Sequence, residues 1–260
     1  MWLLRPWRVG AATAACALLF LTGCGTYPQN PDPYERLNRV MYNVNDGIDK
    51  AALKPLSDVY VAIVPKPVRQ GLGNAFNNLG YLNVILNDFL QGKVDQGFAD
   101  AGRMAVNSTV GVAGIFDVAT KWNLPEHKND FGITLGKWGA EPGPYLVLPL
   151  FGPATVRDVP GRGVSMVTNP LYWVDVPLAA SIPMGVLEAA QTRADLNDLL
   201  KFRDEAAIDP YVFVREGYLN YRRRQIQGTK ATGPAPGFYD EDEPATQPTT
   251  RPATERVTAR

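Results

Sequence analysis

The stretch Phe76–Leu90 reads Phe-Asn-Asn-Leu-Gly-Tyr-Leu-Asn-Val-Ile-Leu-Asn-Asp-Phe-Leu. Its large apolar side chains recur every three or four positions: Phe76, Leu79, Leu82, Leu86 and Phe89. Asparagines and Asp88 fill most of the other positions. This spacing is typical of an amphipathic α-helix, which we expect to end near Gly92. Similar periodicity elsewhere in the chain predicts a mainly α fold.

The segments on either side of this helix carry glycine and other small residues. We interpret Gly71–Phe76, which follows the proline-rich Val64–Pro67, as a turn that feeds the helix. It is one glycine short of a dinucleotide-binding fingerprint and follows no clear strand. A second helix is expected from about Asp95, with small residues from Gly97 to Thr109 at a spacing of four. Such a stripe allows two helices to approach closely, in a membrane or in a soluble bundle.

Three apolar segments follow that lack the length or the continuity of a membrane span. Val110–Phe116 is too short to cross a bilayer, so we expect it in the core or at a membrane boundary. Tyr145–Phe151 is bracketed by proline and glycine, which predicts a constrained loop or hairpin. Val174–Leu187 is broken by Pro177 and Pro183 and interrupted by Asp175, so we expect no continuous transmembrane helix there.

The last helix has clear signals at both ends. Asp209 can cap it, Pro210 suits its first position, and aromatic residues then share one face. The run Arg222–Arg224 closes it, as the helix dipole favours. We expect these arginines on a solvated face, with contact to anionic lipid headgroups as the alternative.

The N-terminus has the layout of a bacterial export signal. Two arginines precede the apolar run Val9–Thr22, which is shorter than the roughly 20 residues of a membrane span. The run ends in Leu21-Thr22-Gly23-Cys24, which resembles a lipobox. This resemblance implies that residues 1–23 are a signal peptide and that Cys24 is lipidated. An ordinary secreted protein would leave Cys24 as a lone thiol, which needs its own explanation.

The lipobox divides the rest of the chain into three parts. Residues 24–31 form a lipidated N-terminus and a short tether, and the extended stretch Gly25–Pro33 reaches only about 30 Å. Residues 32–227 are rich enough in apolar side chains for one helical domain. Residues 228–260 are rich in proline and threonine, and we expect a disordered tail. Gly25, by resemblance to lipoprotein sorting signals, favours the outer membrane, and the tether then holds the domain against the bilayer.

Charge and chemistry exclude several classes of function. The chain carries equal numbers of basic and acidic side chains, and loss of the signal leaves a slight acidic excess, so no nucleic-acid partner is expected. The single histidine, His127, lies in a polar stretch where a solvated or structural role is the simpler interpretation. No nucleophile elbow, Cys-His pair or zinc-ligand cluster is found. We therefore expect no enzyme activity, no catalytic residue, no metal and no cofactor.

Several motifs in fixed order resemble the MlaA/VacJ family of outer-membrane lipoproteins. They extend from about residue 32 to residue 221: Asp32–Asn43, Val64–Arg69, Asn87–Gly92, Arg103–Asp117, Asp130–Gly136, Gly143–Asp158 and Asp209–Glu216. The resemblance implies a ring-like bundle of amphipathic helices with a central channel, lying in the inner leaflet of the outer membrane. It also implies that the protein removes mislocalised phospholipid from the outer leaflet, beside a trimeric porin, and passes it to a soluble periplasmic lipid carrier.

Two segments are our candidates for control of such a channel. The first is Asn43, Val44 and Asn45, where small polar and apolar groups alternate at a helix edge. The second is the proline- and glycine-hinged loop that contains Gly143, Pro144, Tyr145, Leu146 and Phe151. Scaffold packing is the alternative role for both. For the whole protein, the alternatives are a lipoprotein that braces porins and a hydrolase acting on lipid or cell wall.

Overall fold

The computed structural model describes residues 31–173 and 177–228. Helices dominate the described chain, with one two-stranded sheet between them. The α-helices are α2 (Glu35–Ile48), α3 (Lys54–Ile63), α4 (Lys66–Leu90), α5 (Val94–Thr109), α6 (Phe131–Lys137), α7 (Asp158–Thr168), α8 (Leu178–Asp195), α9 (Asn197–Ala206) and α10 (Pro210–Gln227). A π-helix, η2 (Asp49–Leu53), joins α2 to α3, and η3 (Thr120–Trp122) and η4 (Pro170–Tyr172) are short 3₁₀ helices. The strands are β1 (Tyr145–Leu148) and β2 (Gly152–Thr155).

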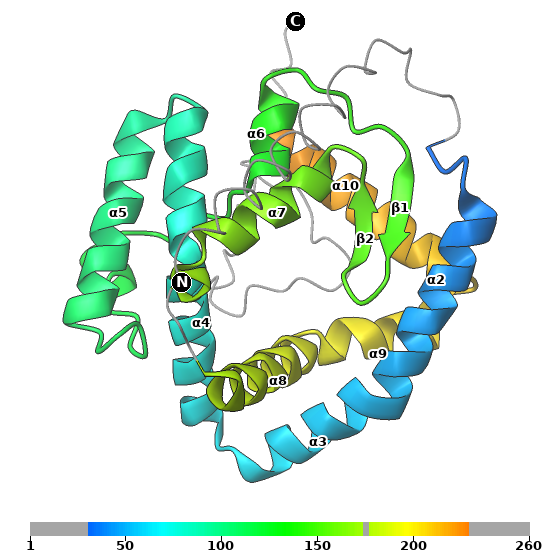
Figure 1. Ribbon diagram of the computed structural model, residues 1–260, viewed down its shortest axis with the longest axis horizontal. Helices are drawn as coiled ribbons and strands as arrows, with labels where there is room; N and C mark the ends of the chain where they lie inside the picture. Colours follow the sequence, from blue (N-terminus) through cyan, green and yellow to red (C-terminus); the bar gives the residue numbers. More distant parts are fainter. Residues whose placement is uncertain (1–30, 174–176, 229–260) are drawn as a thin grey trace, which may run out of the picture.

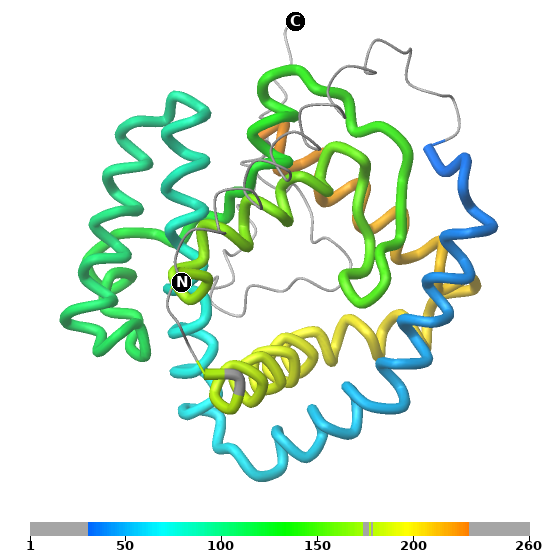
Figure 2. Tube along the Cα trace, viewed as in Figure 1, coloured from blue at the N-terminus to red at the C-terminus, as the bar shows by residue number. Residues whose placement is uncertain are grey.

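The helices form a ring around the β-hairpin (Figures 1 and 2). α2, η2 and α3 make one arc, and α4 continues it on the side opposite α2. α8 packs against α3 and α4, while α5 lies outside the ring against α4. α7 and α10 contact β2, and α6 packs on both of these helices. This arrangement confirms the mainly α, ring-like fold.

The longest helix, α4, begins earlier than the periodicity alone indicates. Its first residues follow Pro65, and it ends before Gly92, whose φ of 72° is easy only for glycine. The prediction of a turn at Gly71–Phe76 was wrong, because this segment is helical. A Cβ at Gly71 would lie 3.0 Å from the Ile115 side chain. This glycine therefore serves close packing between distant segments and not a turn.

The arc α2–η2–α3 changes its hydrogen-bond pattern at a proline. Pro55 has no N–H to donate, so the regular α pattern cannot continue through this point. The five residues Asp49–Leu53 adopt a π-helix there, and α3 starts at Lys54. The wider turn keeps the chain helical while the axis changes direction (Figure 1).

The hairpin prediction for Tyr145–Phe151 is confirmed. β1 and β2 pair antiparallel, with Tyr145 opposite Thr155 and Leu148 opposite Gly152. Positive φ angles at Leu150 (65°) and Gly152 (73°) close the turn. Leu150 and Phe151 form an exposed apolar tip.

Other elements show where local signals decide and where they fail. The helix predicted from about Asp95 is confirmed as α5, and Gly97 packs so closely on Phe89 that a Cβ there would lie 3.0 Å from its ring. The break predicted at Pro183 was wrong, because Pro183 lies inside α8. Asp209 caps α10 through its side chain, which accepts hydrogen bonds from the backbone N–H groups of Tyr211 and Val212.

Candidate functional site

The faces of α4 are inverted with respect to a soluble bundle. The polar residues Asn83, Asn87 and Asp88 are buried, while Leu82, Leu86 and Phe89 of the predicted apolar stripe are exposed. A helix in water normally buries its apolar face. The predicted amphipathic helix is thus confirmed, and Leu82, Leu86 and Phe89 of its apolar stripe leave much of their surface exposed.

The same inversion extends over neighbouring elements. Large exposed apolar side chains occur on α2, α3, α5, the segment after α5 and the hairpin tip, among them Val40, Val59, Ile63, Phe98, Val112, Phe116 and Leu150. Of the two interpretations of Val110–Phe116, the buried core was wrong, because Val110, Val112 and Phe116 are more than half exposed. Exposed apolar surface on this scale marks a contact with a membrane or a partner protein.

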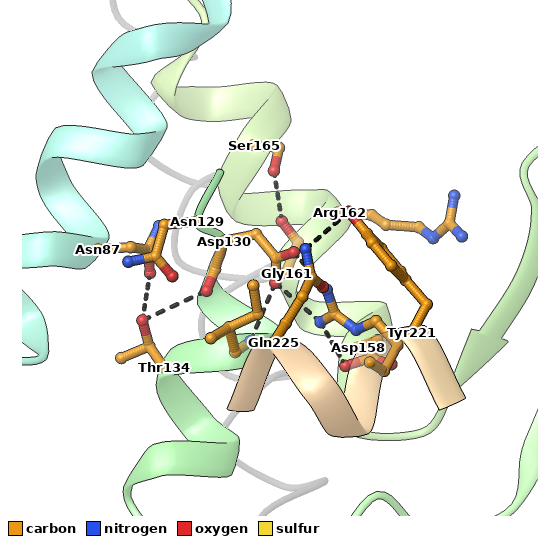
Figure 3. Close-up of polar contacts among 12 residues, drawn as sticks. Asn87, Asn129, Asp130, Thr134, Asp158, Gly161, Arg162, Ser165, Tyr221 and Gln225 are labelled. Atoms are coloured by element: carbon orange, nitrogen blue, oxygen red, sulfur yellow. Dashed lines mark hydrogen bonds and ion pairs between the residues drawn. The ribbon is translucent and has the colours of Figure 1, made fainter. Parts of the chain in front are cut away.

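The interior, in turn, is rich in polar hydrogen bonds. Beside α4, the Thr134 hydroxyl donates to Asn87 Oδ1 at 2.7 Å (Figure 3). The Gln91 amide donates to both Thr134 (2.8 Å) and Asn129 (2.7 Å). Asn129 donates in turn to the buried Asp88 carboxyl at 2.8 Å. These hydrogen bonds offset part of the desolvation penalty of burying the polar face of α4, although Asp88 Oδ2 and Gln91 Oε1 accept no hydrogen bond from any described residue.

A second interior cluster holds α10 to α6 and α7. Arg222 is buried and donates to both carboxyl oxygens of Asp130, at 2.6 and 2.9 Å, and to Asp158 at 2.7 Å (Figure 3). Burial alone would raise the pKa of Asp158, but hydrogen bonds from Arg222, Tyr218 and Thr155 outweigh it and lower the pKa. The expectation of a solvated face was therefore wrong for Arg222, whereas Arg223 is exposed.

The two predicted control segments meet in the structure. Asn45 on α2 donates to the Leu148 carbonyl at 2.9 Å and accepts from the Leu150 backbone N–H at 2.9 Å. These two bonds span the start and the tip of the hairpin turn. One side chain of α2 thus fixes the position of the turn.

Asn38, which the sequence analysis did not single out, makes the matching contact two helical turns earlier. Its amide donates to the Tyr145 carbonyl and accepts from the Val147 N–H, both at 2.9 Å. The spacing of seven residues from Asn45 places both asparagines on the same face of α2. That spacing is a signal in the sequence, but the strand to which it points is more than 100 residues away.

The other two residues of the first segment face elsewhere. Val44 is exposed, and Asn43 lines a cavity of about 300 Å³ between α2, α9 and the start of α10. Only Asn45 of the three contacts the hairpin through its side chain. The structure therefore separates the roles of these neighbours.

In the second segment, Gly143 adopts a φ of 65° just before the strand. The Pro144 carbonyl accepts from the Val156 N–H at 3.2 Å, which closes the base of the hairpin. Tyr145 is fully buried against Tyr211 and Tyr218, and burial raises its pKa, so it stays neutral.

The far end of the hairpin is more open. Leu146 is partly buried, whereas Phe151 is exposed, and its carbonyl accepts from Arg162 at 2.8 Å. The hairpin is thus anchored at its base by Tyr145 and held at its turn by Asn45.

Two further residues from the sequence analysis have clear outcomes. His127 is partly buried, and its Nδ1 lies 2.9 Å from Asp100, which confirms a structural contact. Cys24 lies outside the described residues, as do the signal peptide, most of the tether and the tail.

In the described parts of the chain, no three His, Cys, Asp or Glu side chains converge in a way that could hold a metal ion. None of the described helices combines the length and the apolar character needed to cross a membrane.

Comparison with known proteins gives consistent results. The model of a family described as MlaA lipoprotein matches residues 30–225. The chain is 36% identical over 219 residues to the intermembrane phospholipid transport system lipoprotein MlaA of Escherichia coli (strain K12), covering 81% of this chain and 86% of that protein. The corresponding lipoprotein of Haemophilus influenzae is 32% identical over 218 residues, which cover 79% and 86% of the two chains. A solved structure on the structural basis for maintenance of bacterial outer membrane lipid asymmetry matches with a TM-score of 0.65 and 31% identity, over 75% of this chain and 98% of that chain.

Proposed function

The chain belongs to the MlaA lipoprotein family, and on this premise we propose that it is an outer-membrane lipoprotein that maintains lipid asymmetry by removing mislocalised phospholipid from the outer leaflet. The relatives named as lipoproteins of an intermembrane phospholipid transport system support this assignment. The observation that carries it is the inversion of burial, with asparagine and aspartate inside and leucine and phenylalanine outside.

The inverted faces suit a protein that lies within one leaflet. Acyl chains can cover the exposed apolar residues of α2 to α5, since they need no polar partners. The polar interior of the ring then offers hydrogen-bonding groups to a lipid headgroup that could not cross an apolar wall. We place the ring in the inner leaflet of the outer membrane, where a central channel passes the lipid to the periplasmic side. This transfer makes and breaks no covalent bond.

The hairpin is our candidate for the element that controls this passage. It projects into the ring (Figure 1), and its turn is fixed by two hydrogen bonds from Asn45. The exposed tip residues Leu150 and Phe151 give the hairpin an apolar end that lipid chains can contact. Release of the Asn45 bonds would free the turn to move relative to α2.

Anchoring and partners complete the proposal. Lipidation at Cys24, with its short tether, holds the ring against the membrane, because several acyl chains anchor a protein far more firmly than one. The lipid enters beside a trimeric porin and leaves to a soluble periplasmic carrier. Both partners are inferred from the family resemblance.

The experiment that tests the function is the labelling of surface-exposed phospholipid in whole cells of a deletion strain. We expect surface phospholipid to rise on deletion, and wild type but not Cys24→Ala to restore it. Unchanged labelling in the deletion strain would contradict the proposal.

Two further readouts in the same experiment separate the alternatives. Loss of porin trimers with normal lipid asymmetry would favour a brace. Release of fatty acid from phospholipid by the purified protein would favour a hydrolase.

A further inference from the structure

The cavity of about 300 Å³ opens where α2 and η2 meet α9 and the start of α10. Two of the elements that line it, the blue α2 and the yellow α9, come together in Figure 1, where Arg203 of α9 pairs with Asp46 of α2. Charged side chains of both signs line it in equal number: Arg39, Lys50, Arg203, Asp46, Asp204 and Asp209. We call this site the seam pocket.

The charges of the seam pocket are paired with one another, and Lys50 and Asp204 remain accessible. Lys50 lies 2.6 Å from Asp46 and is 59% exposed, so its ammonium, which has three donors, can also reach a phosphate oxygen. Asp204 lies 2.6 Å from Arg203 and is 50% exposed, so its carboxylate can also accept from an amine. Both signs of charge are therefore available to one ligand.

The second cation of the pocket has a fixed orientation. Arg39 bonds to Asp209 at 2.8 Å, and its guanidinium lies 4.4 Å from the centre of the Tyr211 ring. Arg39 also donates to Glu35 at 2.7 Å, so the aromatic ring and two carboxylates hold the guanidinium plane in place, while 38% of its side chain stays exposed to a phosphate oxygen. The pocket is thus pre-organised by α10 as well as by α2.

The balance of charge selects the class of ligand. Three cations facing three anions give little net attraction to a purely anionic or purely cationic group. A group that carries both a phosphate and an ammonium can pair with each sign at once. The volume corresponds to about ten water molecules, which accommodates the eight heavy atoms of phosphoethanolamine.

Exposed apolar side chains are neighbours of lining residues in the sequence, and together with the proposed function they favour a lipid over a soluble metabolite. Val44 follows Asn43 of the lining, Phe202 precedes Arg203, and Ile208 precedes Asp209, and all three are exposed. Resting on the proposed function, we propose that the seam pocket binds the zwitterionic headgroup of a phospholipid, with the phosphate at Lys50 and Arg39 and the amine at Asp204 and Asp209. Acyl chains then lie over the exposed apolar neighbours.

The test uses full-length, lipidated protein purified from membranes in detergent and mixed with vesicles of equal parts phosphatidylethanolamine and phosphatidylglycerol. Mass spectrometry of the re-isolated protein measures each bound lipid. We expect wild type to retain phosphatidylethanolamine in preference. Lys50→Ala lowers retention of both lipids about tenfold, because a charged hydrogen bond to phosphate is lost. Asp204→Asn leaves the pocket with a net positive charge and shifts the ratio of bound lipids about fivefold towards phosphatidylglycerol.

A neighbouring ion pair provides matched controls. Lys54 and Asp58 on α3 have the same i, i+4 spacing and are 53% and 58% exposed, but they lie outside the pocket. Lys54→Ala and Asp58→Asn should therefore retain lipid like wild type. Thermal unfolding of each variant, run in parallel, shows that a loss of lipid is not a loss of fold.

The outcomes distinguish this inference from the proposed function. If wild type retains lipid and both pocket variants match it, the seam pocket is not the headgroup site, while the proposed function stands. If wild type retains no phospholipid, both proposals fail. If soluble glycerophosphoethanolamine displaces the bound lipid at an equal molar ratio, the apolar neighbours contribute nothing and the lipid is the wrong source of the headgroup.

Discussion

Gly132 shows how a single residue can determine whether two elements meet. An added Cβ would lie 2.5 Å from the Asp158 carboxyl and 2.6 Å from the Arg222 guanidinium. These two groups form the buried ion pair between α7 and α10, and neither can move without leaving a buried charge. The glycine is required by close packing and not by its backbone angles.

We predict that Gly132→Ala lowers the free energy of unfolding by about 3 kcal/mol, because it disrupts a buried pair. Chemical unfolding in detergent measures the loss. Gly217→Ala on α10 is the matched control, since a Cβ there meets nothing within 4 Å. That change should raise stability by about 0.5 kcal/mol through helix propensity. An equal change in the free energy of unfolding in the two variants would show that the ion pair does not need the space at Gly132.

Asn45 links the residue scale to the hairpin. Asn45→Ala removes both hydrogen bonds to the turn, each worth about 1 kcal/mol. We expect faster amide hydrogen exchange at Leu150, and raised surface phospholipid in cells that carry the variant at normal levels. Asn43→Ala leaves both bonds in place and should not change exchange at Leu150. If Asn45→Ala shows faster exchange at Leu150 but normal lipid asymmetry, the hairpin turn does not control lipid passage.

At the scale of elements, the contact between α4 and α5 depends on a buried carboxyl group. Burial and, to a smaller extent, a hydrogen bond to Asp100 raise the pKa of Asp88 from 3.8 to about 6, although Asn129 and Lys93 act in the opposite direction. His127 contacts Asp100 from the segment before α6, and Lys137 of α6 adds positive charge near Asp88. The native state therefore binds a proton at Asp88 more tightly than the unfolded chain does.

The sign of the pH dependence follows from this raised pKa. The stabilisation of the folded state by the proton on Asp88 is fully present below about pH 3.8 and is lost as the pH rises through about 6. We expect Asp88→Asn, which mimics the protonated form, to gain up to about 2 kcal/mol relative to wild type between pH 5 and pH 7. Unfolding at a series of pH values measures this, with the exposed Asp95→Asn as the control. If the free energy of unfolding depends on pH in the same way in wild type and in Asp88→Asn, the group that causes this dependence is not Asp88.

At the scale of the whole molecule, the exposed apolar residues should bind membranes without the lipid anchor. We expect Cys24→Ala protein to float with phospholipid vesicles, and the double variant Val59→Glu, Ile63→Glu to float less. Both side chains are exposed on α3, and each charge would cost about 2.5 kcal/mol or more within the hydrocarbon region. Thr192→Glu adds a charge at an exposed polar position on α8 and is the control. If the double variant floats as well as Cys24→Ala does, α3 does not contact the membrane.

The sequence contains most of the local structure. The period of Phe76–Leu90, the cap at Asp209 and the proline and glycine around Tyr145–Phe151 each act within a few residues, so α4, α10 and the hairpin could be predicted. Pro183 and Gly71–Phe76 show the limit of this approach, because packing keeps both segments helical against their local preference. Neither control segment could be assigned a contact, since Asn45 and its hairpin partners are more than 100 residues apart.

By itself, the sequence determined that helices such as α4 have two unlike faces and where α4 ends and α10 begins, because periodicity and capping are local properties of the chain. Only the tertiary structure decided which face is buried. Asn87 and Asp88 are buried and Leu86 and Phe89 are exposed because Thr134 and Asn129 donate interior hydrogen bonds to the two buried groups. It also decided that Arg222 is buried between Asp130 and Asp158, since that position depends on three elements meeting at one point. The amphipathic pattern is the same for a helix in water and for one in a lipid leaflet, so the pattern alone cannot choose between them.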